Sequence, residues 1–95
     1  MTYLIELKGF QAELCTSELL KTHGVHLKTL YHEKKILFCG PCKDGSALFL
    51  FSTTSQQEVL NLLNQDPFII YSIYQFDRIK EMRLATLENQ FLLNK

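Results

Sequence analysis

The stretch that decides the fold is Ile36–Phe51, ILFCGPCKDGSALFLF, in which two apolar runs flank a segment containing Gly-Pro and Asp-Gly. This pattern is typical of a β-hairpin, and we expect its strands over Ile36–Cys39 and Ala47–Ser52. Because side chains alternate between the two faces of a strand, the run Leu48–Phe51 places large apolar groups on both faces of its sheet. Helices of this chain are expected to cover one face, and a second subunit is expected to cover the other.

Composition and charge limit the possible partners. The 95 residues suffice for one domain, and the ten basic and ten acidic side chains cancel and are scattered. The chain therefore lacks the electrostatic footprint that nucleic acid or an anionic membrane requires. No apolar run approaches the roughly 20 residues of a membrane span, and the N-terminal residues lack signal-peptide features. Three cysteines without disulfide-scaffold spacing agree with a reducing compartment, so we expect a cytoplasmic protein that binds neither nucleic acid nor membrane.

Outward from the hairpin, alternation and helical spacing predict further elements. Gly24 would cost about 1 kcal/mol relative to Ala inside the first helix, so a helix that starts only at Thr22 stays open. Asp66-Pro67 is expected to end the second helix, since the residue before proline avoids the α region. The predicted elements are a strand over Thr2–Lys8, a helix over about Thr16–Lys34 with Leu20, Leu27, Leu30 and Tyr31 on its apolar side, a helix over Ser55–Leu63 capped by Thr54 or Ser55, and a last strand from Tyr74 to Ile79.

The resulting order β-α-β-β-α-β defines the fold class. It is the α+β arrangement that folds into a four-stranded antiparallel sheet with both helices on one face, the ferredoxin-like fold. We expect a single domain over residues 1–95, with a core over about 1–80 and a tail over about 82–95. Leu84, Leu87 and Phe91 have the spacing of a short amphipathic helix in that tail, which would need an apolar surface to dock on.

Cys39-Gly40-Pro41-Cys42 has the spacing of thiol-disulfide oxidoreductases. In such enzymes a helix N-terminus lowers the pKa of the first thiol, whereas here the chain continues through a turn into a strand. We therefore interpret Cys39 as a small buried hydrophobic residue of the strand and Cys42 as a loop residue, and keep a redox function as a minor alternative. A zinc site would need ligands from elsewhere in the chain, and we predict no metal and no cofactor.

The histidines differ in where helical spacing places them. His23 follows Leu20 by three residues and precedes Leu27 by four, so it is expected to point toward the sheet, with His26 at the edge of the apolar stripe and His32 on the solvent side. An inward imidazole needs a partner for its ring N–H, and Asp66 is the candidate carboxylate. The alternative is that Asp66 only caps a turn, because Asp-Pro is a common turn signal.

Together these residues resemble the YciI-like (YCII-related) family. The resemblance rests on His23, Gly40-Pro41, Asp44-Gly45, and Asp66-Pro67-Phe68 followed by Tyr74, and it extends to about Lys80. It implies a ferredoxin-like fold that pairs through its sheets into a dimeric α/β barrel. It also implies a pocket between sheet and helices that contains a His and Asp pair.

Carried onto this sequence, the resemblance assigns the catalytic positions to His23 and Asp66, and substrate contacts to Gly40, Pro41 and Phe68. Leu20 and Gly24 stand where the family usually has an arginine and a leucine. His26, which is followed by Leu27, therefore stays open as an alternative partner of Asp66 and as a substrate contact.

The predicted function is general acid–base proton transfer on a small organic substrate, of isomerase or lyase type, with His23 as base and Asp66 orienting it. The alternative from a different class is a ligand-binding or interaction module without catalysis. The expected partners are a second copy of the chain and a small organic ligand.

Overall fold

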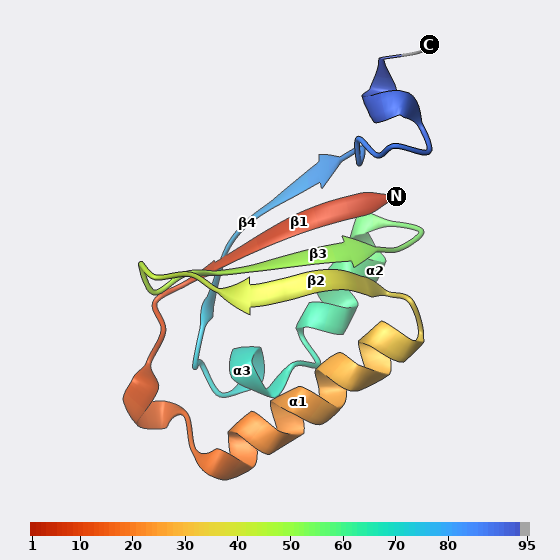
Figure 1. Cartoon of the computed structure of the whole chain (residues 1–95). Helices are drawn as coiled ribbons and strands as arrows, with labels where there is room; N and C mark the ends of the chain where they lie inside the picture. Colours follow the sequence, from red (N-terminus) through yellow and green to blue (C-terminus); the bar gives the residue numbers. More distant parts are fainter. Residues whose placement is uncertain (94–95) are drawn as a thin grey trace.

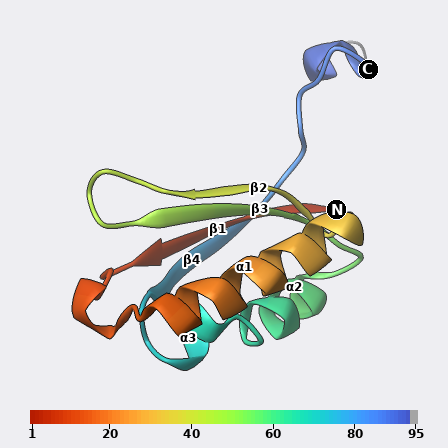
Figure 2. The same ribbon diagram turned by 60° about the horizontal axis from the view of Figure 1, so that its bottom comes forward.

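The structure is a computed structural model that describes residues 1–93. Four antiparallel strands form one sheet in the order β2-β3-β1-β4, and the helices lie together on one face of it (Figures 1 and 2). This is the predicted ferredoxin-like α+β fold. The elements are β1 (Thr2–Lys8), α1 (Ser17–His32), β2 (Ile36–Pro41), β3 (Ala47–Ser52), α2 (Gln56–Leu63), α3 (Pro67–Ile70) and β4 (Gln75–Met82), with short 3-10 turns η1 (Ala12–Leu14) and η2 (Gln90–Leu92).

The predicted bounds of β1 and β3 are confirmed, and their pairing builds the core. Tyr3 lies opposite Phe51, and Ile5 opposite Phe49, on the face that the helices cover. These four side chains are at most 4 % exposed, because alternation brings the apolar members of both strands to the same side. The sheet therefore presents a continuous apolar surface to α1 and α2.

The other face of the sheet is also apolar at its centre. Leu50 pairs with Leu4 on one side and with Phe38 on the other, and Phe38 is 52 % exposed. This agrees with the expectation that the run of large side chains in β3 would place apolar groups on both faces of the sheet. Within residues 1–93, all three α-helices lie on the opposite face, so this outer face has no helix over it (Figure 2).

Helix α1 is continuous, so the alternative start at Thr22 is wrong. Thr16 caps the helix by accepting a hydrogen bond from the Leu19 amide at 3.1 Å, and the chain passes through Gly24 without a break. The apolar stripe also differs from the prediction by one position. Leu19, Leu27 and Leu30 pack on the core, whereas Leu20 and Tyr31 are 56 % and 66 % exposed. Residues 19, 23, 27 and 30 lie on one side of a helix with 3.6 residues per turn, which keeps His23 facing inward.

The second half of the chain departs from the prediction at Asp66-Pro67. Ser55, one of the two predicted caps, is the N-cap of α2, and its hydroxyl accepts a hydrogen bond from the Glu58 amide. The helix ends at Leu63, and Asp66-Pro67 then begins a further helix, α3, of four residues. Proline fits there because the first helical position needs no amide donor. A pattern of four residues is too short to be recognised from periodicity.

The tail does not form the expected amphipathic helix over residues 84–91. Beyond β4 the described chain contains only the 3-10 turn η2, with Phe91 at a φ of 55°. Leu87 is 73 % exposed and Phe91 53 %, and both views show the segment extending away from the sheet and helices (Figures 1 and 2). A short helix is marginal without a surface to pack on, and this segment lies against none of its own domain. The last two residues of the predicted tail, 94–95, lie outside the described residues.

None of the helices in the described part of the chain has both the length and the apolar character needed to cross a membrane.

Candidate functional site

The centre of the site is a hydrogen-bonded pair formed by His23 of α1 and Asp66 at the start of α3. His23 Nδ1 lies 2.8 Å from Asp66 Oδ1, although the two residues are 43 positions apart in sequence. The His23 side chain is 12 % exposed and that of Asp66 only 1 %. The structure thus brings together the two residues that the sequence nominated as base and orienting acid. It places His26 elsewhere on α1, outside the cavity described below.

The backbone holds Asp66 rigidly. Its extended conformation, φ −73° and ψ 125°, lets the carboxylate accept a hydrogen bond from the Phe68 amide at 2.9 Å as the N-cap of α3. Oδ1 therefore accepts from both the imidazole and the backbone. Oδ2 is buried and has no hydrogen-bond partner among the described residues. The turn-capping role and the pairing with histidine, weighed as alternatives from the sequence, are both present in one side chain.

Phe68 fixes the plane of the imidazole. The two rings stack with centroids 3.8 Å apart and planes 4° apart. A stacked ring and a buried hydrogen bond together restrict both torsions of the His23 side chain. Because an ionised carboxylate only accepts hydrogen bonds, Nδ1 must carry the proton in this pair. In the neutral imidazole, Nε2 is then left as a proton acceptor.

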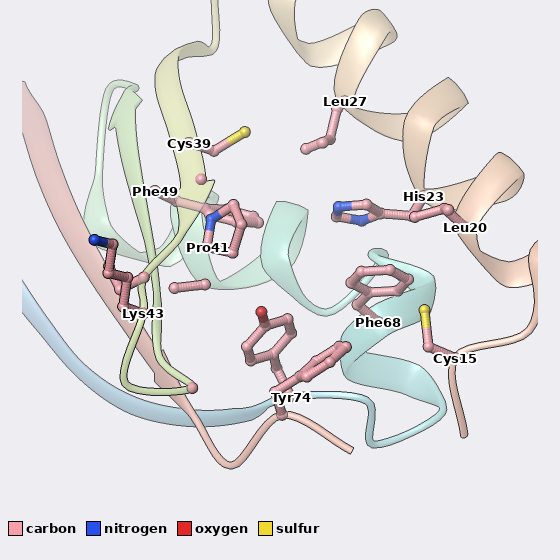
Figure 3. Close-up of a pocket in the computed structure, with 15 residues that line it drawn as sticks. Cys15, Leu20, His23, Leu27, Cys39, Pro41, Lys43, Phe49, Phe68 and Tyr74 are labelled. Atoms are coloured by element: carbon pink, nitrogen blue, oxygen red, sulfur yellow. The ribbon is translucent and has the colours of Figure 1, made fainter. Parts of the chain in front are cut away.

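His23 borders a cavity of about 690 Å³ between the helices and the β2–β3 end of the sheet (Figure 3). Its volume lies within the range of pockets that hold small organic molecules. Gly40, Pro41 and Phe68, which the family resemblance assigned to substrate contacts, all border it. The remaining lining residues are mostly apolar or aromatic, and they are Phe10, Cys15, Leu20, Leu27, Cys39, Cys42, Lys43, Gly45, Ala47, Phe49 and Tyr74.

The Cys39 and Cys42 thiols border the same cavity but are poorly placed for dithiol chemistry. Strand β2 runs through Pro41, and the Cys42 amide still donates to the Ser46 carbonyl oxygen across the hairpin. Residues three apart in extended chain are separated by roughly 10 Å, whereas a disulfide requires Cα atoms within about 7 Å. Cys39 is exposed, so the expectation that it would be buried is wrong. Partial desolvation, and secondly the negative charge of Asp66, nevertheless raise the pKa of its thiol. A raised pKa opposes thiolate formation, so this geometry does not favour the redox alternative.

Grouped metal ligands are not found at this site. Across residues 1–93, no three His, Cys, Asp or Glu side chains lie close enough together to hold a metal ion.

Tyr74 is the site residue that sequence reasoning missed. The sequence assigned it to the last strand, but it lies just before β4, and its ring borders the cavity near Phe68 (Figure 3). Burial raises the pKa of its hydroxyl, with smaller contributions from Cys15 and Cys42. The signal available in the sequence was an aromatic residue with a polar end at the point where the chain enters a strand of the sheet.

The fold and the site define a small α+β protein of ferredoxin-like fold with a His-Asp pair at the wall of an apolar cavity. No family model and no curated protein matches the sequence. Among solved structures, the fold is similar to that of the 5-chloro-2-hydroxyhydroquinone dehydrochlorinase TftG from Burkholderia phenoliruptrix AC1100, in a complex with 2,5-dihydroxybenzoquinone. The match has a TM-score of 0.61 at 22 % sequence identity and covers 87 % of this chain and 94 % of that chain. This likeness supports the ferredoxin-like fold that the resemblance implied, and the YciI-like family itself stays a prediction.

Proposed function

We propose that this protein is a YciI-like enzyme that moves a proton on a small organic substrate, with His23 as general base and Asp66 as the residue that orients it. The observation that carries the proposal is the His23–Asp66 hydrogen bond of 2.8 Å at the wall of the apolar cavity. The bond assigns the proton of the neutral ring to Nδ1 and leaves Nε2 to accept a proton from a bound molecule.

The buried carboxylate supports this role in two ways. It fixes the imidazole in one orientation, and it stabilises the imidazolium that forms when the ring takes a proton. General acid–base catalysis of this kind typically contributes about 10²–10⁴ in rate. Such a contribution suits isomerisation or elimination beside a carbonyl group better than cleavage of an unactivated bond. The name of TftG, a dehydrochlorinase, denotes an elimination, and that class of reaction removes a proton.

The test is hydrogen exchange at activated C–H positions. Wild-type protein is incubated in D₂O with a panel of small neutral carbonyl compounds that includes 2-tetralone, and deuterium incorporation is followed by NMR. We expect His23→Gln to lower the exchange rate by about 10²–10⁴, because glutamine has similar reach but cannot take the proton. His26→Gln is the matched control on the same helix and should retain the wild-type rate.

The alternative, a binding module without catalysis, predicts a different outcome. His23→Gln would then cost about 1–3 kcal/mol in unfolding free energy through the disturbed buried hydrogen bond, while wild-type protein would accelerate no exchange. Loss of exchange in His26→Gln but not in His23→Gln would also contradict the proposed role.

We further propose that the protein is a homodimer that pairs through the outer face of its sheet. The exposed Phe38 and the half-buried Leu4 flank the buried Leu50, and together they form an apolar strip across three strands of that face. Sedimentation velocity at micromolar concentration should show a dimer for the wild type and a monomer for Phe38→Lys. Tyr31→Lys, an exposed position on α1, is the control that should stay dimeric. A monomeric wild type would contradict this proposal. The cytoplasmic location expected from the cysteines also stays a prediction.

A further inference from the structure

The ring of Tyr74 is held firmly at the wall of the cavity. Its backbone amide donates to the Phe68 carbonyl oxygen at 3.1 Å, which ties it to α3. The ring packs at a tilt between Phe10, with centroids 5.2 Å apart, and Phe68, with centroids 6.1 Å apart. The residue is 7 % exposed. Phe68 therefore contacts both Tyr74 and the imidazole of His23, so the three rings form one rigid wall.

The hydroxyl of Tyr74 points into the same space as the His23 imidazole (Figure 3). Within residues 1–93 no hydrogen bond to this hydroxyl is found, and it is also not among the fully buried polar atoms that lack a partner. Tyrosine hydroxyls in nearly buried positions usually have a hydrogen-bond partner. Since the atom is open to the cavity, water or a molecule bound in the cavity can be its hydrogen-bond partner.

This hydroxyl is protonated at neutral pH, because the ordinary pKa of tyrosine, 10.0, lies well above 7 and burial raises the pKa of Tyr74 further. A protonated phenol donates a hydrogen bond to an acceptor oxygen. The cavity thus contains a proton acceptor, Nε2 of His23, and a hydrogen-bond donor, the Tyr74 hydroxyl.

The charge of the cavity points to a neutral ligand. Lys43 lies at its edge with the ammonium group directed away from the other lining side chains (Figure 3). Among the described lining residues there is no other lysine and no arginine. An anion would therefore be desolvated there without a cationic partner, which is unfavourable. Flat apolar molecules, in contrast, fit a site walled by Phe10, Phe49 and Phe68.

We propose that Tyr74 is a second catalytic residue, whose hydroxyl donates a hydrogen bond to the carbonyl oxygen of a flat, neutral substrate while Nε2 of His23 removes a proton from the adjacent carbon. This inference rests on the proposed function and names its substrate class. The C–H bond breaks, its proton forms the N–H bond of the imidazolium, and the electron pair moves to the carbonyl oxygen as an enolate. The imidazolium then returns the proton to the same or another carbon, or a leaving group departs with its electron pair.

Two variants test this role. Tyr74→Phe removes only the hydroxyl and keeps both ring contacts, so its melting temperature should match the wild type. We expect its kcat for hydrogen exchange of 2-tetralone to fall by about 10²–10³, as for the loss of one donor to a developing oxyanion. Tyr71→Phe removes a hydroxyl from a residue that is 58 % exposed and outside the cavity, and it should keep the wild-type rate. An unchanged rate in Tyr74→Phe, beside a loss in His23→Gln, overturns the inference and leaves the proposed function intact.

A spectroscopic readout separates the two further. When 2-tetralone labelled with ¹³C at its carbonyl enolises in H₂O, it regains the same hydrogens, so turnover does not change its infrared spectrum. A shift of its carbonyl band therefore reports on hydrogen bonding in the bound state. A hydrogen bond from Tyr74 should move this band to lower frequency in the wild type and in His23→Gln, and the shift should disappear in Tyr74→Phe. A shift that persists in Tyr74→Phe, or that is absent in the wild type, refutes the assignment whatever role His23 has.

Discussion

Replacing Asp66 with alanine should destabilise the protein by an amount that follows from its two hydrogen bonds. The Phe68 amide loses its cap, which costs about 1 kcal/mol. The Nδ1–H group of His23 loses its buried acceptor, which costs about 1–3 kcal/mol. The two bonds use different donors, so their costs add to about 2–4 kcal/mol in the free energy of unfolding.

Asp66→Asn should cost much less. The asparagine side-chain oxygen can accept from both donors, and asparagine is a good N-cap. What is lost is the charge, and a hydrogen bond to an ionised acceptor is about twice as strong as a neutral one, so the expected cost is about 1 kcal/mol. This variant therefore separates the geometry of the pair from its charge.

The assay is urea unfolding followed by circular dichroism, at a single protein concentration so that any self-association affects all variants equally. Asp77→Ala, at an exposed position of β4, is the control and should lie within about 0.5 kcal/mol of the wild type. The reasoning is refuted if Asp66→Ala costs less than about 1 kcal/mol, or if Asp66→Asn is as damaging as Asp66→Ala.

Three further predictions concern other parts of the chain. Cys39 should react slowly with iodoacetamide at neutral pH, and Asp66→Asn should speed this labelling, since removing the carboxylate charge lowers the pKa of the thiol. The rate is measured by peptide mass spectrometry, and an unchanged rate in Asp66→Asn would contradict the prediction. Hydrogen bonds from Lys35 and then Thr54 lower the pKa of Glu58, so its contribution is present above the unfolded-state pKa and is lost as pH falls through the folded-state pKa. Glu58→Gln should thus destabilise at neutral pH and lose this effect in acid, which urea titrations at both pH values would show. Deleting residues 84–95 should leave the melting temperature of the domain unchanged, because the hydrogen bonds found for residues 84–93 all stay within that segment, and a lowered melting temperature would contradict this.

The sequence by itself determined most of the sheet. Alternation in Thr2–Lys8, and the apolar run Ala47–Ser52 after the Asp-Gly turn, predicted both strands with their bounds. In Thr2–Lys8 a one-residue slip would bring the buried Tyr3 to the outer face. Helical spacing was less restrictive. A stripe that passes through Leu19 or through Leu20 fits the period nearly as well, and only packing against the sheet selects Leu19.

The tail shows why helical spacing is not sufficient. Leu84, Leu87 and Phe91 have the right intervals, but a short amphipathic segment is helical only where its apolar side is buried. In the tertiary structure this segment extends away from the sheet and helices, so its apolar side is not buried (Figure 2). The helix that the pattern predicts is therefore not formed in residues 84–91.

For the site, the sequence could nominate its members but could not position them. His23 was expected to face inward from its place between Leu20 and Leu27, and Asp66 was a candidate partner because a buried imidazole needs an acceptor. Their contact spans 43 positions and exists only because α3, which was not predicted, starts at Asp66 against α1. Tyr74 was missed for the same physical reason: whether its hydroxyl is buried, exposed or open to a cavity depends on how α3 and β4 pack around it, and a one-dimensional pattern carries no record of that packing.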